Sequence, residues 1–108
     1  MFKTKIEGLS GYIYGNGPVQ GYGKIDGYPW YFRARHDFWH MEITDVKDME
    51  PEDLPIVGDA YSGWEISENW GKGHEASYMP ESVALALIES VVEKFRSGQL
   101  TFVEYMPE

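Results

Sequence analysis

The chain has no cysteine, which excludes disulfide bonds and thiolate metal sites. Its apolar runs fall well short of the roughly 20 residues that cross a bilayer. The residues after Lys3 and Lys5 are too polar for the central region of a signal peptide. We therefore expect a soluble, cytoplasmic protein that has no contact with a membrane.

Basic residues are also scarce, since nine lysines and arginines stand against eighteen acidic residues and the net charge is −9. Binding to nucleic acid depends on cations that neutralise phosphates, so we expect no direct nucleic-acid binding. The same charge would attract a partner protein with a basic surface. An acidic composition that serves only solubility is the alternative.

Short motifs for nucleotide binding, metal binding and covalent catalysis are missing as well. The glycines between Gly15 and Gly23 have the wrong spacing for a dinucleotide site, and a strand follows them instead of a helix. An EF-hand loop starting at Asp48 would need glycine and glutamate where Asp53 and Asp59 stand. His36 and His40 share a face only on a helix, and the surrounding pattern is that of strands. We predict no cofactor, no metal site and no enzymatic activity.

Aromatic residues, in contrast, make up 16% of the chain, and many lie in residues 28–43. Folded back at His36-Asp37, this segment becomes a β-hairpin with two different faces, because side chains alternate along a strand. One face pairs Trp30, Phe32 and Ala34 with Ile43, Met41 and Trp39. The other pairs Tyr31, Arg33 and Arg35 with Glu42, His40 and Phe38.

A second turn is predicted at Asp26-Gly27, since Asp-Gly suits the positive φ angles of a type I′ turn. The resulting register places Gly21 opposite Phe32 and Gly23 opposite Trp30. The predicted meander has strands at 20–25, 30–35 and 38–45, and Pro29 ends the pairing with the last of them.

One helix is predicted over about 80–97. Pro80 suits its first turn and Gly98 its C-terminal cap, and apolar residues recur between them at helical spacing. Further strands are expected at 12–14, 61–67 and 100–105, and a turn at 8–11. The predicted fold is therefore α+β: one domain over 1–108, with an antiparallel sheet of four to six strands, the helix packed on one face and a short final strand.

Two candidate binding surfaces follow from this arrangement. The first is the polar and aromatic face of the meander, where large rings and arginines resemble the composition of binding hot spots. Its residues are Tyr22, Tyr31, Arg33, Arg35, Phe38, His40 and Glu42. The second is the acidic segment 45–59, with Asp48, Glu50, Glu52 and Asp53. Within the first surface, Glu42 beside His40 and Arg33 is interpreted as a cross-strand charged cluster.

These features favour a small acidic protein-binding module without catalytic activity. Such a module would be an inhibitor or adaptor of a larger protein, and a nucleic-acid-binding protein would suit its charge. A phage counter-defence protein that imitates the phosphate backbone is the most specific version. One alternative is a small-molecule or carbohydrate-binding domain with an aromatic-lined cleft and weak hydrolase activity, in which Trp39, Trp64 or Trp70 would line the cleft. Another is a structural subunit that forms a homodimer.

Overall fold

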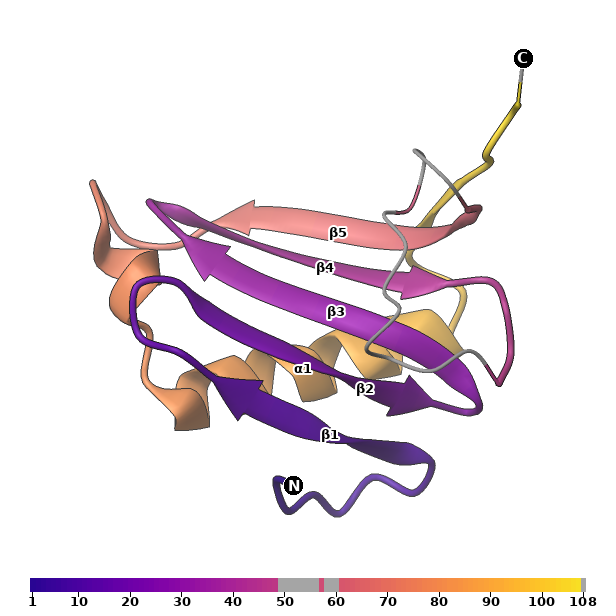
Figure 1. The fold of residues 1–108 in the computed structure, drawn as a ribbon, viewed down its shortest axis with the longest axis horizontal. Helices are drawn as coiled ribbons and strands as arrows, with labels where there is room; N and C mark the ends of the chain where they lie inside the picture. The colour runs from indigo at the N-terminus through magenta and orange to yellow at the C-terminus, as the bar shows by residue number, and fades with distance from the viewer. Residues whose placement is uncertain (49–56, 58–60, 108) are drawn as a thin grey trace.

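The chain folds into a six-stranded antiparallel sheet with one helix packed against one face (Figure 1). The computed structural model describes residues 1–48, 57 and 61–107. Each strand pairs with its neighbours in the sequence, in the order β1-β2-β3-β4-β5-β6. The elements are β1 (Leu9–Tyr14), β2 (Val19–Ile25), β3 (Tyr28–Arg35), β4 (Phe38–Thr44), β5 (Gly63–Asn69), the 3₁₀ helix η2 (Glu75–Tyr78), α1 (Glu81–Arg96) and β6 (Thr101–Val103). The predicted α+β fold is confirmed.

The two predicted hairpins have the predicted registers. In the β3–β4 hairpin Trp30 lies opposite Ile43 and Arg33 opposite His40. In the β2–β3 hairpin Gly21 lies opposite Phe32. Asp26 and Gly27 both have positive φ angles, 51° and 87°, as a type I′ turn requires. Alternation of apolar and polar residues, combined with short turns, was therefore sufficient to fix this part of the sheet.

Helix α1 matches the predicted range 80–97 to within one residue at each end. The sequence predicted Pro80 in the first helical turn. In the structure Pro80 is the N-terminal capping residue, one position before that turn. At the other end Gly98 has a φ of 72°, and its N–H donates to the carbonyl of Phe95 while that of Gln99 donates to Lys94. This is a Schellman motif, which needs the left-handed conformation that glycine adopts without strain.

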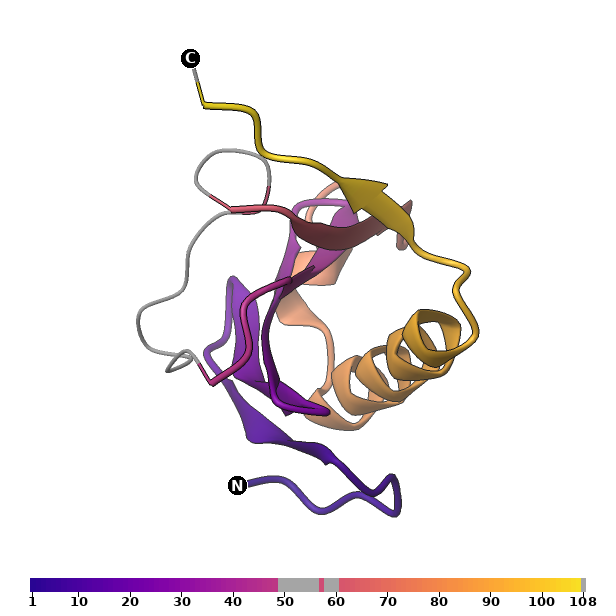
Figure 2. The same ribbon diagram turned by 90° about the vertical axis from the view of Figure 1, so that its right-hand side faces the viewer.

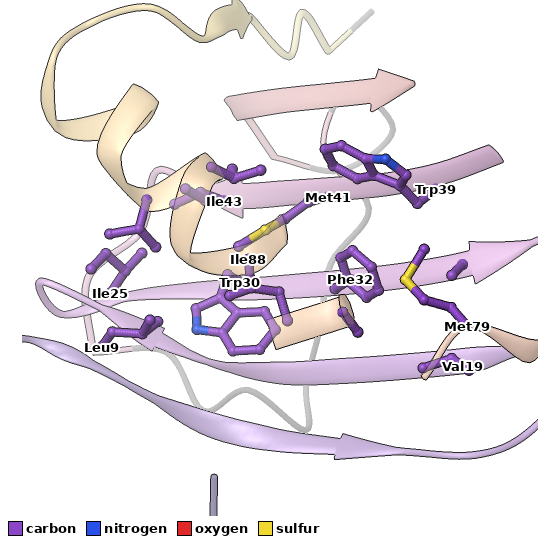
Figure 3. Close-up of a cluster of buried hydrophobic side chains, with 14 of the residues drawn as sticks. Leu9, Val19, Ile25, Trp30, Phe32, Trp39, Met41, Ile43, Met79 and Ile88 are labelled. Atoms are coloured by element: carbon purple, nitrogen blue, oxygen red, sulfur yellow. The ribbon is translucent and has the colours of Figure 1, made fainter. Parts of the chain in front are cut away.

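The core lies between α1 and the face of the sheet that carries the apolar residues of the meander (Figure 3). Trp30, Phe32 and Met41 are fully buried there against Ile88 and its neighbours on the helix. The sheet curves around α1, so the helix occupies its concave side (Figure 2). The opposite, convex side is called the outer face below.

Glycines make room for the largest core side chain. The indole of Trp30 lies over Gly11 and Gly21, where an added Cβ would come 2.5 and 3.3 Å from the ring. The indole N–H donates to the carbonyl of Ser10 at 3.2 Å. Trp30 therefore joins β3 to β1 across β2, which explains the glycines at these positions of β1 and β2.

Several details differ from the sequence-based prediction, and one of them is that β3 begins at Tyr28 and not at residue 30. Strand β1 begins at Leu9 and includes part of the segment predicted as a turn, and β5 is shifted two residues toward the C-terminus. Strand β6 is shorter than the predicted 100–105, and η2 was not predicted. A four-residue helix and a three-residue strand show too little periodicity to be recognised in a sequence. No helix in the described part of the chain has the length and apolar character needed to cross a membrane.

Candidate functional site

The outer face carries the polar and aromatic residues that the sequence assigned to it. In the sheet registers Tyr31, Arg33 and Arg35 lie opposite Glu42, His40 and Phe38, and Tyr22 lies opposite Tyr31. These predicted site residues are therefore brought together on one side of the sheet, away from α1. The β1–β2 register adds Tyr12 opposite Tyr22 and Tyr14 opposite Gln20.

Tyrosine rings pack against one another across β1 and β2. The ring centroid of Tyr22 lies 5.7 Å from that of Tyr12 and 5.9 Å from that of Tyr14. Tyr12 and Tyr14 nevertheless expose 46% and 47% of their surface. Tyr31 donates from its hydroxyl to Oε1 of Gln20 at 2.8 Å, and partial burial raises the pKa of this hydroxyl. The cluster is therefore ordered by its own contacts and still accessible.

Arginines and a phenylalanine continue this patch across β3 and β4. Arg35 is exposed, and Phe38 opposite it exposes 38% of its surface. Arg33 is half-buried, and its Nε is buried without a hydrogen-bond acceptor in the described part of the chain. We call the whole patch the tyrosine–arginine surface, made of Tyr12, Tyr14, Tyr22, Tyr31, Arg33, Arg35 and Phe38.

A second group on the outer face combines one histidine with two glutamates on β4 and β5. His40 Nε2 lies 3.2 Å from Oε2 of Glu42, two residues along β4, and Glu65 lies opposite Glu42 on β5. One side-chain ligand atom from each of the three residues lies within 4.8 Å of the others. Glu42 is only 5% exposed. We call this group the His–Glu cluster.

Sequence reasoning found His40 and Glu42 but missed Glu65. Identifying Glu65 required the β4–β5 register, and the long segment between these strands sets no geometric limit on how they pair. Tyr12 and Tyr14 were missed for a related reason, because the loop between β1 and β2 is longer than a two-residue turn and permits more than one register. Their alternation about Ile13 was the available signal.

A pair of histidines also meets at the end of the β3–β4 hairpin. His36 occupies the turn, and its Nδ1 lies 3.3 Å from Nδ1 of His74, with both side chains exposed. The sequence separated these residues by 38 positions and gave no reason to pair them. They provide two possible ligands for a metal, whereas the His–Glu cluster provides three.

The outer face is covered at the end where β3 and β5 begin and β4 ends. Pro29 and Thr44 are buried, and a Cβ built on Gly63 would lie 3.0 Å from Cγ2 of Val57, so Val57 packs over this end. Asp48 is exposed, and its N–H donates to the carbonyl of Gly27 at 3.0 Å. The remaining acidic residues proposed as a binding segment, Glu50, Glu52 and Asp53, lie outside the described residues.

Tryptophans belong to the core side of the sheet. Trp39 is 3% exposed, and Trp64 and Trp70 pack against the core as partly buried residues. A cleft of about 320 Å³ opens between β5 and the segment leading into β6. It is lined by Glu65, Ile66, Ser67, Gln99, Leu100 and Thr101. None of these lining residues is aromatic, so this cleft lacks the aromatic lining expected for carbohydrate binding.

Comparisons of the chain with protein-family models, with curated proteins and with solved structures find no match. The functional argument therefore depends on the surface chemistry of the outer face.

Proposed function

We propose that this protein is a small, non-catalytic binding module that docks a partner protein on its tyrosine–arginine surface. The observation that carries the proposal is the exposure of Tyr12 and Tyr14, packed on Tyr22, on the convex side of the sheet. Tyrosine and arginine are enriched at binding hot spots because they combine a large contact area with directed hydrogen bonds. A convex aromatic surface suits a protein partner better than a small ligand, which needs a concave pocket.

Arg33 adds a specific requirement to this surface. Its buried Nε has no acceptor in the described part of the chain, and a buried donor without an acceptor costs about 1–3 kcal/mol. A carbonyl or carboxylate oxygen of a partner placed over β3 would supply that acceptor. We therefore expect Arg33 to lie near the centre of the contact.

The net charge of −9 supports a partner whose surface is basic overall. Long-range attraction speeds the encounter, while the tyrosine–arginine surface provides the short-range contacts. Proteins that bind nucleic acid present such basic surfaces, so an inhibitor or adaptor of a nucleic-acid-binding protein is the specific form of the proposal. Phage counter-defence by phosphate mimicry is its most specific version.

Affinity capture from a native lysate with matched variants tests the proposal. We expect the wild type to capture one or more proteins that Tyr14→Ala and Arg35→Ala do not capture. The affinity of each variant for such a partner should be reduced at least about tenfold. Tyr78→Ala is the control, because Tyr78 is a more exposed tyrosine, at 66%, that lies on η2 instead of the outer face. Equal capture by wild type and face variants would contradict the proposal.

Repeating the capture at high salt tests the charged partner separately. Attraction between exposed charges is screened by salt, so binding to a basic partner weakens as ionic strength rises. Binding that is insensitive to salt would contradict nucleic-acid mimicry and leave the tyrosine–arginine surface as the contact. Light scattering coupled to gel filtration identifies the homodimer alternative, in which the captured partner is a second copy of the chain.

A further inference from the structure

We propose that His40, Glu42 and Glu65 bind one Zn²⁺ ion on the outer face of the sheet. This inference is independent of the proposed protein-binding function. It depends on the His–Glu cluster, on the charge balance around that cluster and on the orientation of the histidine ring.

The three side chains approach the arrangement that a tetrahedral zinc site requires. Their ligand atoms lie within 4.8 Å of one another, and His40 Nε2 and Glu42 Oε2 are 3.2 Å apart. Bonds of about 2.1 Å to one ion place tetrahedral ligands about 3.4 Å apart. The half-buried Glu65 side chain would have to rotate to close the remaining gap, while the two strands that carry the ligands are paired with each other along their length. The fourth position remains for water or for a donor atom of a bound molecule.

The charge balance of the cluster favours a cation. Glu42 is 5% exposed and lies directly opposite Glu65, which places two carboxylates side by side across the β4–β5 ladder. Like charges in this relation are destabilising, and a buried charge requires a partner. Within the described residues, neither lysine nor arginine forms an ion pair with Glu42 or Glu65. This holds also for Arg33, which lies opposite His40 on β3 and forms no ion pair with either glutamate.

The histidine ring is oriented by a residue outside the cluster. His40 Nδ1 lies 2.6 Å from the hydroxyl of Ser67, its cross-strand neighbour on β5. With zinc bound, Nδ1 would donate its proton to this oxygen, which leaves the lone pair of Nε2 free for the ion. A second hydrogen bond of this kind is the usual support of a metal-binding histidine, because it fixes both the tautomer and the ring orientation.

Ligand type selects zinc among the common divalent ions. Imidazole nitrogen is a good ligand for Zn²⁺ and a poor one for Mg²⁺ and Ca²⁺, which prefer six or more oxygen ligands. The cluster supplies one nitrogen and carboxylate oxygens from two residues. We therefore expect Zn²⁺ to bind in preference to Mg²⁺ and Ca²⁺.

Isothermal titration of the metal-free chain with ZnCl₂ tests the site. We expect one ion per chain, bound at least about tenfold more weakly by Glu65→Gln, which keeps the shape of the side chain and removes its charge. Glu68→Gln is the matched control, because Glu68 lies on the same strand with its side chain on the opposite side. It should bind zinc like the wild type.

Thermal unfolding provides a second measurement. Zn²⁺ should raise the Tm of the wild type and of Glu68→Gln but not that of Glu65→Gln, because a ligand that binds only the folded state stabilises it. Equal concentrations of Mg²⁺ should leave all three unchanged. The unfolding curves also show that each variant is folded.

The His36–His74 pair is the competing source of zinc binding, and His74→Gln distinguishes the two. Zinc affinity that survives in His74→Gln and falls in Glu65→Gln supports the proposed site. The reverse result would overturn it and assign the ion to the two histidines. Absence of measurable binding by the wild type would overturn it as well.

Discussion

Individual residues on β3 and β4 differ sharply in what they contribute, although they alternate along the same strands. Trp39 is 3% exposed and stacks on Phe32 with ring centroids 5.9 Å apart. Arg35, which pairs with Phe38, lies on the other face of the hairpin and is exposed. A period of two residues was enough to assign each of these side chains to its face from the sequence alone.

Replacing Trp39 by alanine should therefore remove a large part of the stability of the fold. Removal of a buried aromatic side chain costs about 3–5 kcal/mol, against a total stability of about 5–15 kcal/mol. Arg35→Ala should change the free energy of unfolding by less than about 0.5 kcal/mol. Urea denaturation followed by circular dichroism measures both, and similar losses in the two variants would mean that the two faces of the hairpin are assigned wrongly.

The His–Glu cluster was predictable from the sequence only in part. His40 and Glu42 lie two apart on one strand, so their common face follows from the sequence. Glu65 and Ser67 join them only through the β4–β5 register. No property of Glu65 itself distinguishes it from the other acidic residues of the chain.

At the scale of elements, the sequence predicts the pairing of strands that are joined by short turns. The two-residue turns after β2 and β3 leave one register that places Trp30, Phe32 and Met41 together on the buried face, and this register is observed. Helix α1 was equally predictable, because its apolar stripe and its glycine cap mark both its face and its end. In contrast, η2 is held by tertiary contacts that leave no periodic pattern.

Those contacts lead to a prediction about Ser77. Its hydroxyl accepts a hydrogen bond from the backbone N–H of His36 at 2.9 Å, and the N–H of Ala76 donates to the carbonyl of His36 at 2.8 Å. Ser77 is 8% exposed, so Ser77→Ala leaves the His36 donor without its acceptor. We expect a loss of about 1–2 kcal/mol in the free energy of unfolding, measured in urea.

Ser82→Ala is the control for this prediction, because Ser82 is exposed in the first turn of α1. It should change stability by a few tenths of a kcal/mol. A Ser77→Ala variant as stable as Ser82→Ala would show that η2 is not held to the hairpin turn by this bond.

At the scale of the whole molecule, one arginine joins three segments that are distant in the sequence. Arg96 at the end of α1 donates from Nε and Nη2 to Asp26 in the β2–β3 turn, at 3.0 and 2.8 Å. Its Nη2 also donates to the carbonyl of Glu7 in the N-terminal segment. The hydrogen bond from Arg96 lowers the pKa of Asp26 below its ordinary value of 3.8.

This pKa shift gives a pH dependence with a definite sign. A carboxyl group whose pKa is lowered by folding stabilises the folded state above its ordinary pKa, and the contribution is lost as pH falls through the lowered value. Asp26→Asn, which keeps a residue suited to the turn, should lower stability at neutral pH by about 0.5–1 kcal/mol, since the pair is exposed. The difference from the wild type should shrink below about pH 4. Urea denaturation across this range measures it, and a difference that does not vary with pH would contradict the argument.

The overall architecture was predictable because its parts are local: turns, alternation and one amphipathic helix. The sequence says less about function, since a surface of tyrosines and arginines suggests a place of contact without naming a partner, and protein binding there is our proposal. The structure sharpens the prediction by showing which aromatic residues are exposed and which form the core.

The sequential order of the strands also has a consequence for the speed of folding. β1 to β4 are joined by connections of two to four residues, so each ladder closes a short loop at a small entropic cost. Hairpins of this kind form in about 1–10 μs. Strand β6, in contrast, reaches β5 only after residues 70–100 have crossed the concave face as η2 and α1. We expect the meander to assemble first and the last strand to join when the helix has docked, which makes the C-terminal end the slowest part of the chain to reach its place.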